Sequence, residues 1–296
     1  MDRLKSELSI VVPVHQMAGR LGNLEASMQI ARSNYLSVNF LLIHDGTHNE
    51  TLNELKSISQ RYASQLFEVD YQSPGLTRNV GIRNLQTPWV AFWDSDDIGY
   101  AGNLLKAIKA CPNYVNVLIG GYEERVSGKG SRFVHPRVGR DFSSNFVNPG
   151  LWRFVFRSER LEGVEFIKSR MGEDQVFLAE LQIDSKEIST SREIFYTYFT
   201  NQVQSLSQDK KAIGEVATSN LYLKNMFNQG LLKHRYQKVI LLRMLLTEMK
   251  YSKSVNSLSQ KRNTNSTLAH FKLLREFLSP AIVILVEISR KFFIRA

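Results

Sequence analysis

Three carboxylates close a run of strand-forming residues. The stretch WVAFWDSDD, residues 89–97, ends in Asp94, Asp96 and Asp97. On an extended backbone Asp94 and Asp96 share one side of the strand. Carboxylates this close repel one another, so the pattern favours a bound cation. A few hard oxygen ligands suit Mg²⁺ or Mn²⁺, which keep open positions for substrate phosphates. The alternative is an acidic strand-to-helix turn in which Asp96 or Asp97 is an N-cap.

A second acidic pair, Glu173 and Asp174, stands in MGEDQVFLAEL, where a helix is expected to begin. The helix dipole favours an ionised carboxylate at this position. An ionised Asp174 could accept the proton of an attacking hydroxyl. The alternative is ordinary acidic chemistry at a helix N-terminus.

Three further residues could contact a nucleotide. Asp45 precedes a glycine in LLIHDGTHNET, and its carboxylate could accept a hydrogen bond from a base or a ribose. Pro13 ends the first strand, where a base could stack. Arg78 lies near the start of a helix in SPGLTRNVGIRNL and suits a phosphate. Each residue also has a structural alternative. Asp45 could simply form a turn, Pro13 could simply end the strand, and Arg78 could be a solvated surface arginine.

The elements that must position these residues alternate over the first 125 positions. Hydrophobic patterning predicts strands at 8–14, 38–46, 66–70, 89–94 and 116–124. Helices are expected at 20–33, 49–64, 75–85 and 101–111. This order predicts an α/β fold with a mostly parallel sheet and helices on both faces. Ligands then gather beyond the carboxyl ends of the strands.

The later part of the chain changes in character. Residues 126–145 indicate a loop or a loose hairpin, and an extended stretch (146–158), a helix (171–183) and a strand (192–199) should follow. After about residue 210 only helices are expected. We therefore divide the chain into a body, 1–209, and an all-helical extension, 210–296.

The amino-acid composition limits the class of protein and the cellular compartment that we expect. The 296 residues are 43% hydrophobic and 22% charged, which excludes a disordered chain. The single cysteine, Cys111, excludes an internal disulfide framework and any multi-cysteine metal site, and it fits a reducing compartment. Neither a secretory leader nor a membrane-spanning segment is predicted. We expect a cytoplasmic protein.

The net charge of +10 is unevenly placed. Residues 1–209 carry 22 Lys/Arg against 24 Asp/Glu, whereas residues 210–296 carry 16 against 4. A basic excess confined to an apolar tail argues against nucleic-acid binding, which needs a basic face on the folded domain. The segment FLSPAIVILVEISRKFFIRA, residues 277–296, is apolar, basic and aromatic. It predicts docking on an anionic membrane surface. Packing of residues 231–249 on the body, or a homo-oligomer interface, is the alternative.

Taken together, the motifs resemble the family 2 glycosyltransferases, which have the GT-A fold. The resemblance covers roughly residues 8–205 and rests on motifs in a fixed order: SIVVPVHQ, LLIHDGTHNET, GLTRNVGI, WVAFWDSDD, GEDQVF and YTYFTNQVQSLSQ. It implies a Rossmann-like, mostly parallel mixed sheet, with a nucleotide-binding half at about 1–125 and an acceptor-side half at about 126–209.

The resemblance also implies an activity. The enzyme would move a hexosyl or N-acetylhexosaminyl group from a nucleoside diphosphate, with UDP preferred, to a hydroxyl of a glycan or a lipid-linked saccharide, with inversion. The product would be a cell-surface polysaccharide or glycan.

Each candidate residue takes a role from the resemblance. Asp174 would be the general base, and Asp94, Asp96 and, alternatively, Asp97 would contact the Mn²⁺ or Mg²⁺ ion. Pro13, Asp45, Arg78, Asp94 and Ser95 would bind the donor, and Glu173 and Trp152 would support the acceptor side. The chain departs from the family pattern at His44, where the family often has a second acid.

Two other classes of function remain open from the residues alone. A sugar-nucleotide-forming nucleotidyltransferase could use a similar sheet, but it should carry a Gly-rich phosphate loop after the first strand. PVHQMAGRLGN supplies no convincing one. A non-enzymatic protein that binds nucleic acid or a membrane surface through basic side chains is the third reading.

Overall fold

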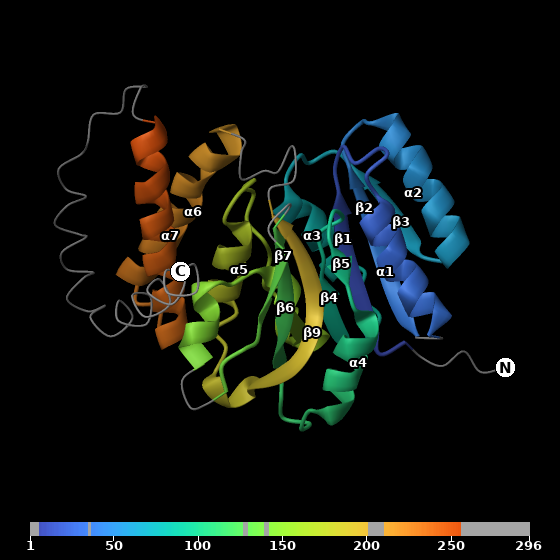
Figure 1. Ribbon diagram of the computed structural model, residues 1–296. Coiled ribbons are helices and arrows are strands. Elements are labelled where there is room, and N and C mark those ends of the chain that lie inside the picture. Colours follow the sequence, from blue (N-terminus) through green and yellow to red (C-terminus); the bar gives the residue numbers. More distant parts are fainter. Residues whose placement is uncertain (1–5, 35–36, 127–129, 139–141, 201–209, 256–296) are drawn as a thin grey trace.

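The computed structural model describes residues 6–34, 37–126, 130–138, 142–200 and 210–255. A nine-stranded sheet, ordered β3-β2-β1-β4-β8-β6-β9-β5 with β7 paired to β6, runs through this part of the chain. Helices cover both of its faces (Figure 1). The predicted α/β class is confirmed.

The first half of the sheet is parallel, as predicted. β2 and β4 flank β1, and β3 lies outside β2, all in parallel register. The strands are β1 (Leu8–Val14), β2 (Val38–Asp45), β3 (Gln65–Val69) and β4 (Trp89–Phe92). The connecting helices are α1 (Gly22–Ser33), α2 (Asn49–Tyr62) and α3 (Pro74–Arg83). Parallel neighbours need crossover connections of this kind, so their carboxyl ends meet at one edge.

Local signals explain where these helices begin and end. The His48 side chain accepts a hydrogen bond from the Thr51 amide at the start of α2, and Ala63 ends that helix in the left-handed conformation. Pro74 opens α3, where its missing N–H is not needed. Gly81 of α3 lies against β1, because a Cβ there would fall 2.3 Å from a methyl carbon of Val11.

The second half of the sheet is mixed, which the sequence did not predict in detail. β8 (Phe154–Arg157) lies antiparallel between β4 and β6 (Val117–Val126), while β9 (Ile188–Thr200) is parallel to β6. The short β5 (Ile98–Gly99) and β7 (Gly130–Val134) pair antiparallel with β9 and β6. Residues 126–145 were expected to form a loop or a loose hairpin, and β7 in this range pairs with the end of β6, Tyr122–Val126, which mostly precedes it. Short 3₁₀ turns occupy Phe142–Val147 and Leu151–Arg153, where an extended stretch was expected from residue 146.

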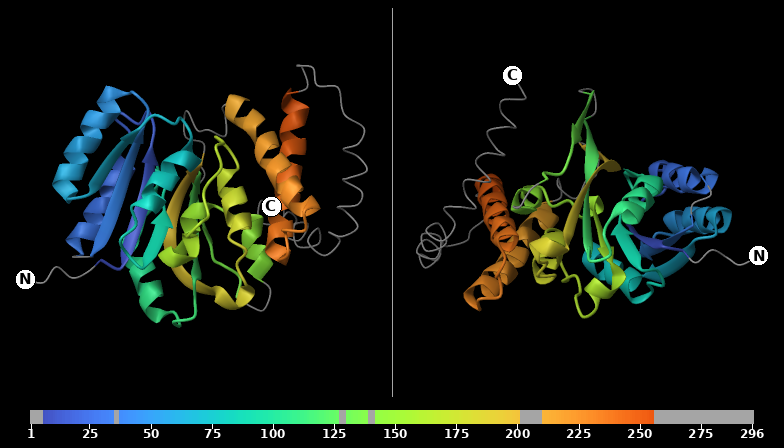
Figure 2. Two further views of the ribbon diagram at one scale, coloured as in Figure 1. Left: turned by 180° about the vertical axis from the view of Figure 1, so that it is seen from behind. Right: turned by 90° about the horizontal axis from the view of Figure 1, so that it is seen from below.

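Alternation along the strands gives the sheet two apolar faces. Ile10 and Val12 pack with α1, α2 and α4 (Ala101–Ala110) in one buried cluster. Val11 and Phe92 pack with α3, α5 (Glu173–Glu180) and the C-terminal helices in the other. Both faces are therefore buried, as a doubly wound sheet requires (Figure 2).

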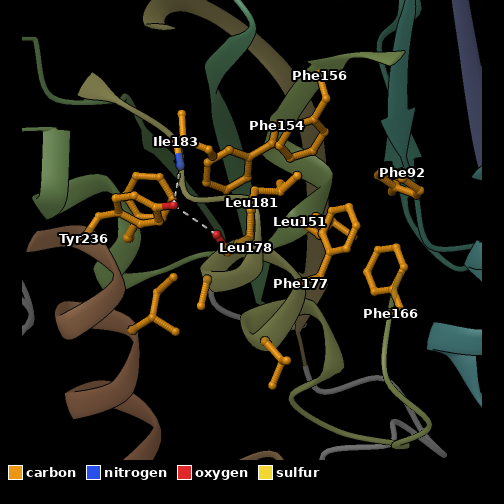
Figure 3. Packing of buried hydrophobic residues seen from close by; sticks show 14 of the residues in the cluster. Phe92, Leu151, Phe154, Phe156, Phe166, Phe177, Leu178, Leu181, Ile183 and Tyr236 are labelled. Carbon is orange, nitrogen blue, oxygen red and sulfur yellow. Dashed lines mark hydrogen bonds between the residues drawn. The ribbon is translucent and has the colours of Figure 1, made fainter. Parts of the chain in front are cut away.

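The helices of the extension belong to the second apolar cluster. α6 (Lys210–Asn228) and α7 (Arg235–Val255) lie side by side and cover α5 (Figure 1). Tyr236 of α7 lies among aromatic residues of the body (Figure 3), with its ring centroid 4.4 Å from that of Phe146. Val239 and Ile240 of α7 are buried in the same cluster. In this part of the extension, the alternative of packing on the body is the one observed.

No helix in residues 6–34, 37–126, 130–138, 142–200 and 210–255 is long and apolar enough to cross a membrane. The predicted membrane-docking segment, 277–296, lies outside the described residues.

Candidate functional site

The strand-end acids lie between β4 and the short β5, which pairs with β9. The Asp94 amide donates a hydrogen bond to the Tyr196 hydroxyl of β9, at 2.9 Å. The Asp94 side chain is 38% exposed, so it can reach a ligand. Asp96 is more enclosed: burial, then repulsion by Asp94, raises the pKa of its carboxyl to about 6. The two carboxylates that share a side of the strand are therefore costly to ionise together.

Asp97 is held differently. Its carboxylate accepts a hydrogen bond from the Phe199 amide of β9, at 2.8 Å, and the residue is 3% exposed. Burial and repulsion by Asp96 and Asp94 raise its pKa to about 9. Asp97 thus ties the strand end to β9, and a metal-ligand role for it stays a prediction. Ser95 is also buried, and its donor contact likewise stays a prediction.

Arg78 joins the two acidic motifs. Its Nη2 lies 2.9 Å from Asp94 Oδ1, and its Nη1 lies 2.8 Å from Glu173 Oε1. The guanidinium is buried and stands over the Phe166 ring, with the Arg78 Cζ 5.6 Å from the ring centroid. The sequence alternative of a solvated surface arginine is therefore wrong. One cation brings the strand-end acids and the helix-start acids into a single site.

The second acidic pair lies at the start of α5, as predicted. Gly172 precedes it in the left-handed conformation, with φ of 86°, which a glycine adopts without strain. Glu173 is buried against Arg78. The Gln175 amide donates to Asp174 Oδ1 at 2.9 Å. Burial raises the pKa of both acids, while Arg78 opposes the rise. A raised pKa makes the carboxylate a stronger base, which suits a general base that works near neutral pH.

Asp45 anchors a loop in this structure. Its two carboxylate oxygens accept hydrogen bonds from the backbone amides of Tyr71, Gln72 and Ser73 and from the Thr77 hydroxyl, at 2.6 to 3.0 Å. These contacts fix the segment that leads into α3 and Arg78. Recognition of a base or ribose by Asp45 stays a prediction.

The other predicted residues lie in varied settings. Pro13 is half-buried near the end of β1, beside β2. Trp152 is 8% exposed and stacks on Tyr196 and Tyr198, with ring centroids 4.9 and 5.6 Å away. It therefore supports β9, and an acceptor contact stays a prediction. His44 is buried, and burial lowers its pKa.

The strand-end acids fit a divalent cation that takes few protein ligands. The described residues contain no group of three or more His, Cys, Asp or Glu side chains placed to hold a metal ion. Asp94 and Asp96 remain as candidate oxygen ligands, and burial together with the charge of Asp94 raises the pKa of Asp96. Mg²⁺ and Mn²⁺ bind through one or two carboxylates and leave the other positions to phosphate and water.

Three contributors to the site were not predicted. Tyr196 contacts the Asp94 backbone, Gln175 of α5 contacts Asp174, and Arg243 of α7 contacts Gln175. An aromatic strand around Tyr196 was visible in the sequence, and Gln175 follows the acidic pair directly. Nothing local distinguishes Arg243 from the other basic residues of its helix.

A groove of about 820 Å³ lies elsewhere on the described surface. It is bounded by the end of α3, the 158–167 loop and Tyr222 of α6. None of the candidate site residues lines it. The acidic site is therefore identified by its chemistry rather than by the shape of this groove.

No protein-family model and no curated protein matches the sequence. Solved structures do resemble the fold. Residues 1–349 of S. aureus TarS in complex with UDP-GlcNAc match with a TM-score of 0.62 at 16% identity, over 93% of this chain and 81% of that one.

Two further structures are similar. The Pyrobaculum calidifontis mannosyltransferase PcManGT, in complex with GDP-Man and Mn²⁺, has a TM-score of 0.54 at 13% identity, over 98% and 88% of the two chains. Mannosyl-3-phosphoglycerate synthase from Rubrobacter xylanophilus has 0.53 at 12%, over 77% of each chain. At these identities the likeness establishes the fold, which is the GT-A fold.

Proposed function

We propose that this GT-A protein is a metal-dependent, inverting glycosyltransferase. It would transfer a sugar from a nucleoside diphosphate, with UDP the expected carrier, to a hydroxyl of a glycan or a lipid-linked saccharide. The observation that carries the proposal is the Arg78 bridge, whose two ion pairs of 2.9 and 2.8 Å join Asp94 and Glu173. Two acidic motifs with different chemistry thereby meet at one guanidinium.

The donor side of the proposal rests on β4. Asp94 and Asp96 would hold Mn²⁺ or Mg²⁺, and the bound cation would offset negative charge on the departing diphosphate. Arg78 adds a fixed positive charge beside the same acid. Asp45 acts in this scheme by holding the 71–73 segment, and through it the start of α3.

The acceptor side rests on α5. Asp174 would take the proton from an acceptor hydroxyl. An electron pair of that hydroxyl oxygen would then form a bond to the anomeric carbon as the bond from this carbon to the diphosphate breaks. The nucleoside diphosphate leaves with the electrons of that bond. Attack opposite the leaving group inverts the anomeric configuration. No covalent intermediate is needed.

The similar structures support the choice of donor class. TarS is solved with UDP-GlcNAc, and PcManGT is solved with GDP-Man and Mn²⁺. Both ligands are nucleoside diphosphate sugars, although their bases differ. The site geometry described here favours neither base, so the test must include both.

A donor screen tests the proposal. Purified protein is incubated with UDP-GlcNAc, UDP-glucose, GDP-mannose and related donors, with Mn²⁺ or Mg²⁺, and release of the nucleoside diphosphate is measured. We expect turnover of at least one donor, loss of turnover with EDTA, and loss in Asp96→Asn. The matched control is Asp184→Asn, which changes an exposed acid that precedes the amino end of β9.

Several outcomes would contradict the proposal. Failure of every donor to turn over or to raise the melting temperature would reject it. Release of pyrophosphate from a nucleoside triphosphate and a sugar phosphate would favour the nucleotidyltransferase alternative. A product that retains the donor's anomeric configuration, read by NMR, would reject the inverting mechanism.

A further inference from the structure

The C-terminal helices hold the helix that carries Asp174 at its N-terminal end. Glu215 of α6 accepts a hydrogen bond from the Arg170 amide at 2.6 Å, and the Ser219 hydroxyl donates to the Met171 carbonyl at 2.9 Å. A Cβ at Gly172 would lie 2.6 Å from the Met244 methyl of α7. The turn that leads into α5 is therefore packed directly against α6 and α7.

Side chains of α7 hold the other end of α5. The Tyr236 hydroxyl of α7 accepts from the Ile183 amide at 2.7 Å and donates to the Leu178 carbonyl at 3.3 Å (Figure 3). The Gln237 side chain donates to the Ala179 carbonyl at 2.6 Å. α5 has only 8 residues, too few for a stable isolated helix. Its geometry depends on these contacts.

Between the two ends, α7 reaches Asp174 through one side chain. Arg243 Nη1 donates to Gln175 Oε1 at 3.2 Å. Gln175 in turn approaches both oxygens of Asp174, with its amide N 2.9 Å from Oδ1 and its Nε2 3.4 Å from Oδ2. Gln175 is 6% exposed, so solvent does not replace these contacts easily.

We propose that Arg243 is a positioning residue for the Asp174 carboxylate and acts through the side chain of Gln175. The inference rests on the proposed function, in which Asp174 is the general base. A guanidinium can only donate hydrogen bonds, so the atom of the Gln175 side chain that faces Arg243 must be the oxygen, Oε1. The side-chain nitrogen, Nε2, is then directed at Asp174, and this contact holds the carboxylate in one orientation.

Charge acts in the same direction as geometry. The charged groups that act on Asp174 are Arg78 of α3, Glu173 of α5 and Arg243 of α7. Both arginines favour the ionised carboxylate and oppose the effect of burial on the pKa of Asp174. Loss of Arg243 should raise that pKa and leave less of the base ionised at a given pH.

The kinetic test compares Arg243→Gln and Arg243→Lys with the wild type. The pH profile of kcat/KM is measured with a donor that the wild type turns over. In Arg243→Gln we expect the acidic limb of kcat/KM to move up by roughly one pH unit, so that kcat/KM on that limb falls about tenfold. KM for the donor should stay unchanged. Arg243→Lys, which keeps the positive charge, should show a smaller shift than Arg243→Gln.

The control is Lys238→Gln, which removes one positive charge from the same helix. Five residues of helix turn Lys238 about 140° away from Arg243. If Arg243→Gln and Lys238→Gln give the same acidic limb, the inference is wrong. A lower melting temperature alone would not support it, because a purely structural role predicts the same loss.

A second measurement does not depend on turnover. The carboxyl carbon of Asp174 is titrated by NMR in protein labelled at aspartate, with the signal assigned from Asp174→Asn. We expect its pKa to rise in Arg243→Gln and to stay unchanged in Lys238→Gln. This measurement needs no turnover of a donor. Failure of the proposed function can therefore be distinguished from failure of the inference about Arg243. If Arg243→Gln does not fold, Gln175→Leu breaks the same link, and an unshifted Asp174 would then reject the inference.

Discussion

The two acidic clusters of the site sit in different electrostatic settings. At the strand end, Asp94, Asp96 and Asp97 lie close together, and repulsion among them adds to burial in raising the pKa of Asp96 and Asp97. At the helix start, burial raises the pKa of Glu173 and Asp174. Arg78 opposes the rise at both acids, and Arg243 opposes it at Asp174. In the proposed function an added cation would stabilise the first cluster, whereas arginines of the protein itself stabilise the second.

Arg78 links the clusters while leaving them distinct. It contacts Asp94 on one side and Glu173 on the other. Asp96 lies beyond that bridge, and Asp174 has its own connection to α7 through Gln175. This difference agrees with the proposed function, in which the strand end would bind the cation and the helix start would accept the proton.

The largest expected effect comes from neutralising one acid in each cluster. In Asp174→Asn, kcat should fall by about 10²- to 10⁴-fold, because the general base is lost. Donor binding with Mn²⁺, measured by calorimetry, should be unchanged. Asp96→Asn should instead weaken Mn²⁺-dependent donor binding. If Asp174→Asn and Asp96→Asn weaken Mn²⁺-dependent donor binding equally, the two clusters do not have the different roles proposed for them.

The shared cation offers a second test. Arg78→Met leaves Glu173 buried without its partner, so the free energy of unfolding should fall by about 3–5 kcal/mol in urea titration. Arg83→Met on the same helix breaks only an exposed pair with Glu165, with 52% and 64% of the side chains exposed. That control should lose about 0–1 kcal/mol. Similar losses in both variants would show that Arg78 does not stabilise the site.

The smallest effect concerns the strand end and pH. The pKa of Asp97 is raised from 3.8 to about 9, so its protonated form is favoured on folding. Its contribution to stability is fully present below about pH 4 and is lost as the pH rises through about 9. Without divalent cations, the melting temperature should therefore fall over this range.

Asp97→Asn, which stays neutral, should flatten the fall by roughly 2–4 °C in calorimetry. The exposed control Asp70→Asn should follow the wild type. A slope that is unchanged in Asp97→Asn would mean that Asp97 ionises freely in the folded protein.

Sequence patterns specified the order of the elements because those patterns are local. Apolar runs that alternate with helix-like segments predicted the parallel strands of the first half, and the Gly-led acidic pair predicted the start of α5. The antiparallel insertion of β8 between β4 and β6 was not predicted. Strand direction in that half depends on which distant segments pair, and no short motif records this.

The sequence by itself determined which acids end β4 and which begin α5, since each set follows from its own neighbours. Only the tertiary structure decided how they are used. It placed Arg78 between them, turned Asp97 toward Phe199, and gave Asp45 a loop to hold. The physical reason is that a buried polar group must find its partner wherever the packed chain supplies one. For these residues the partner lies on another element, often many residues away.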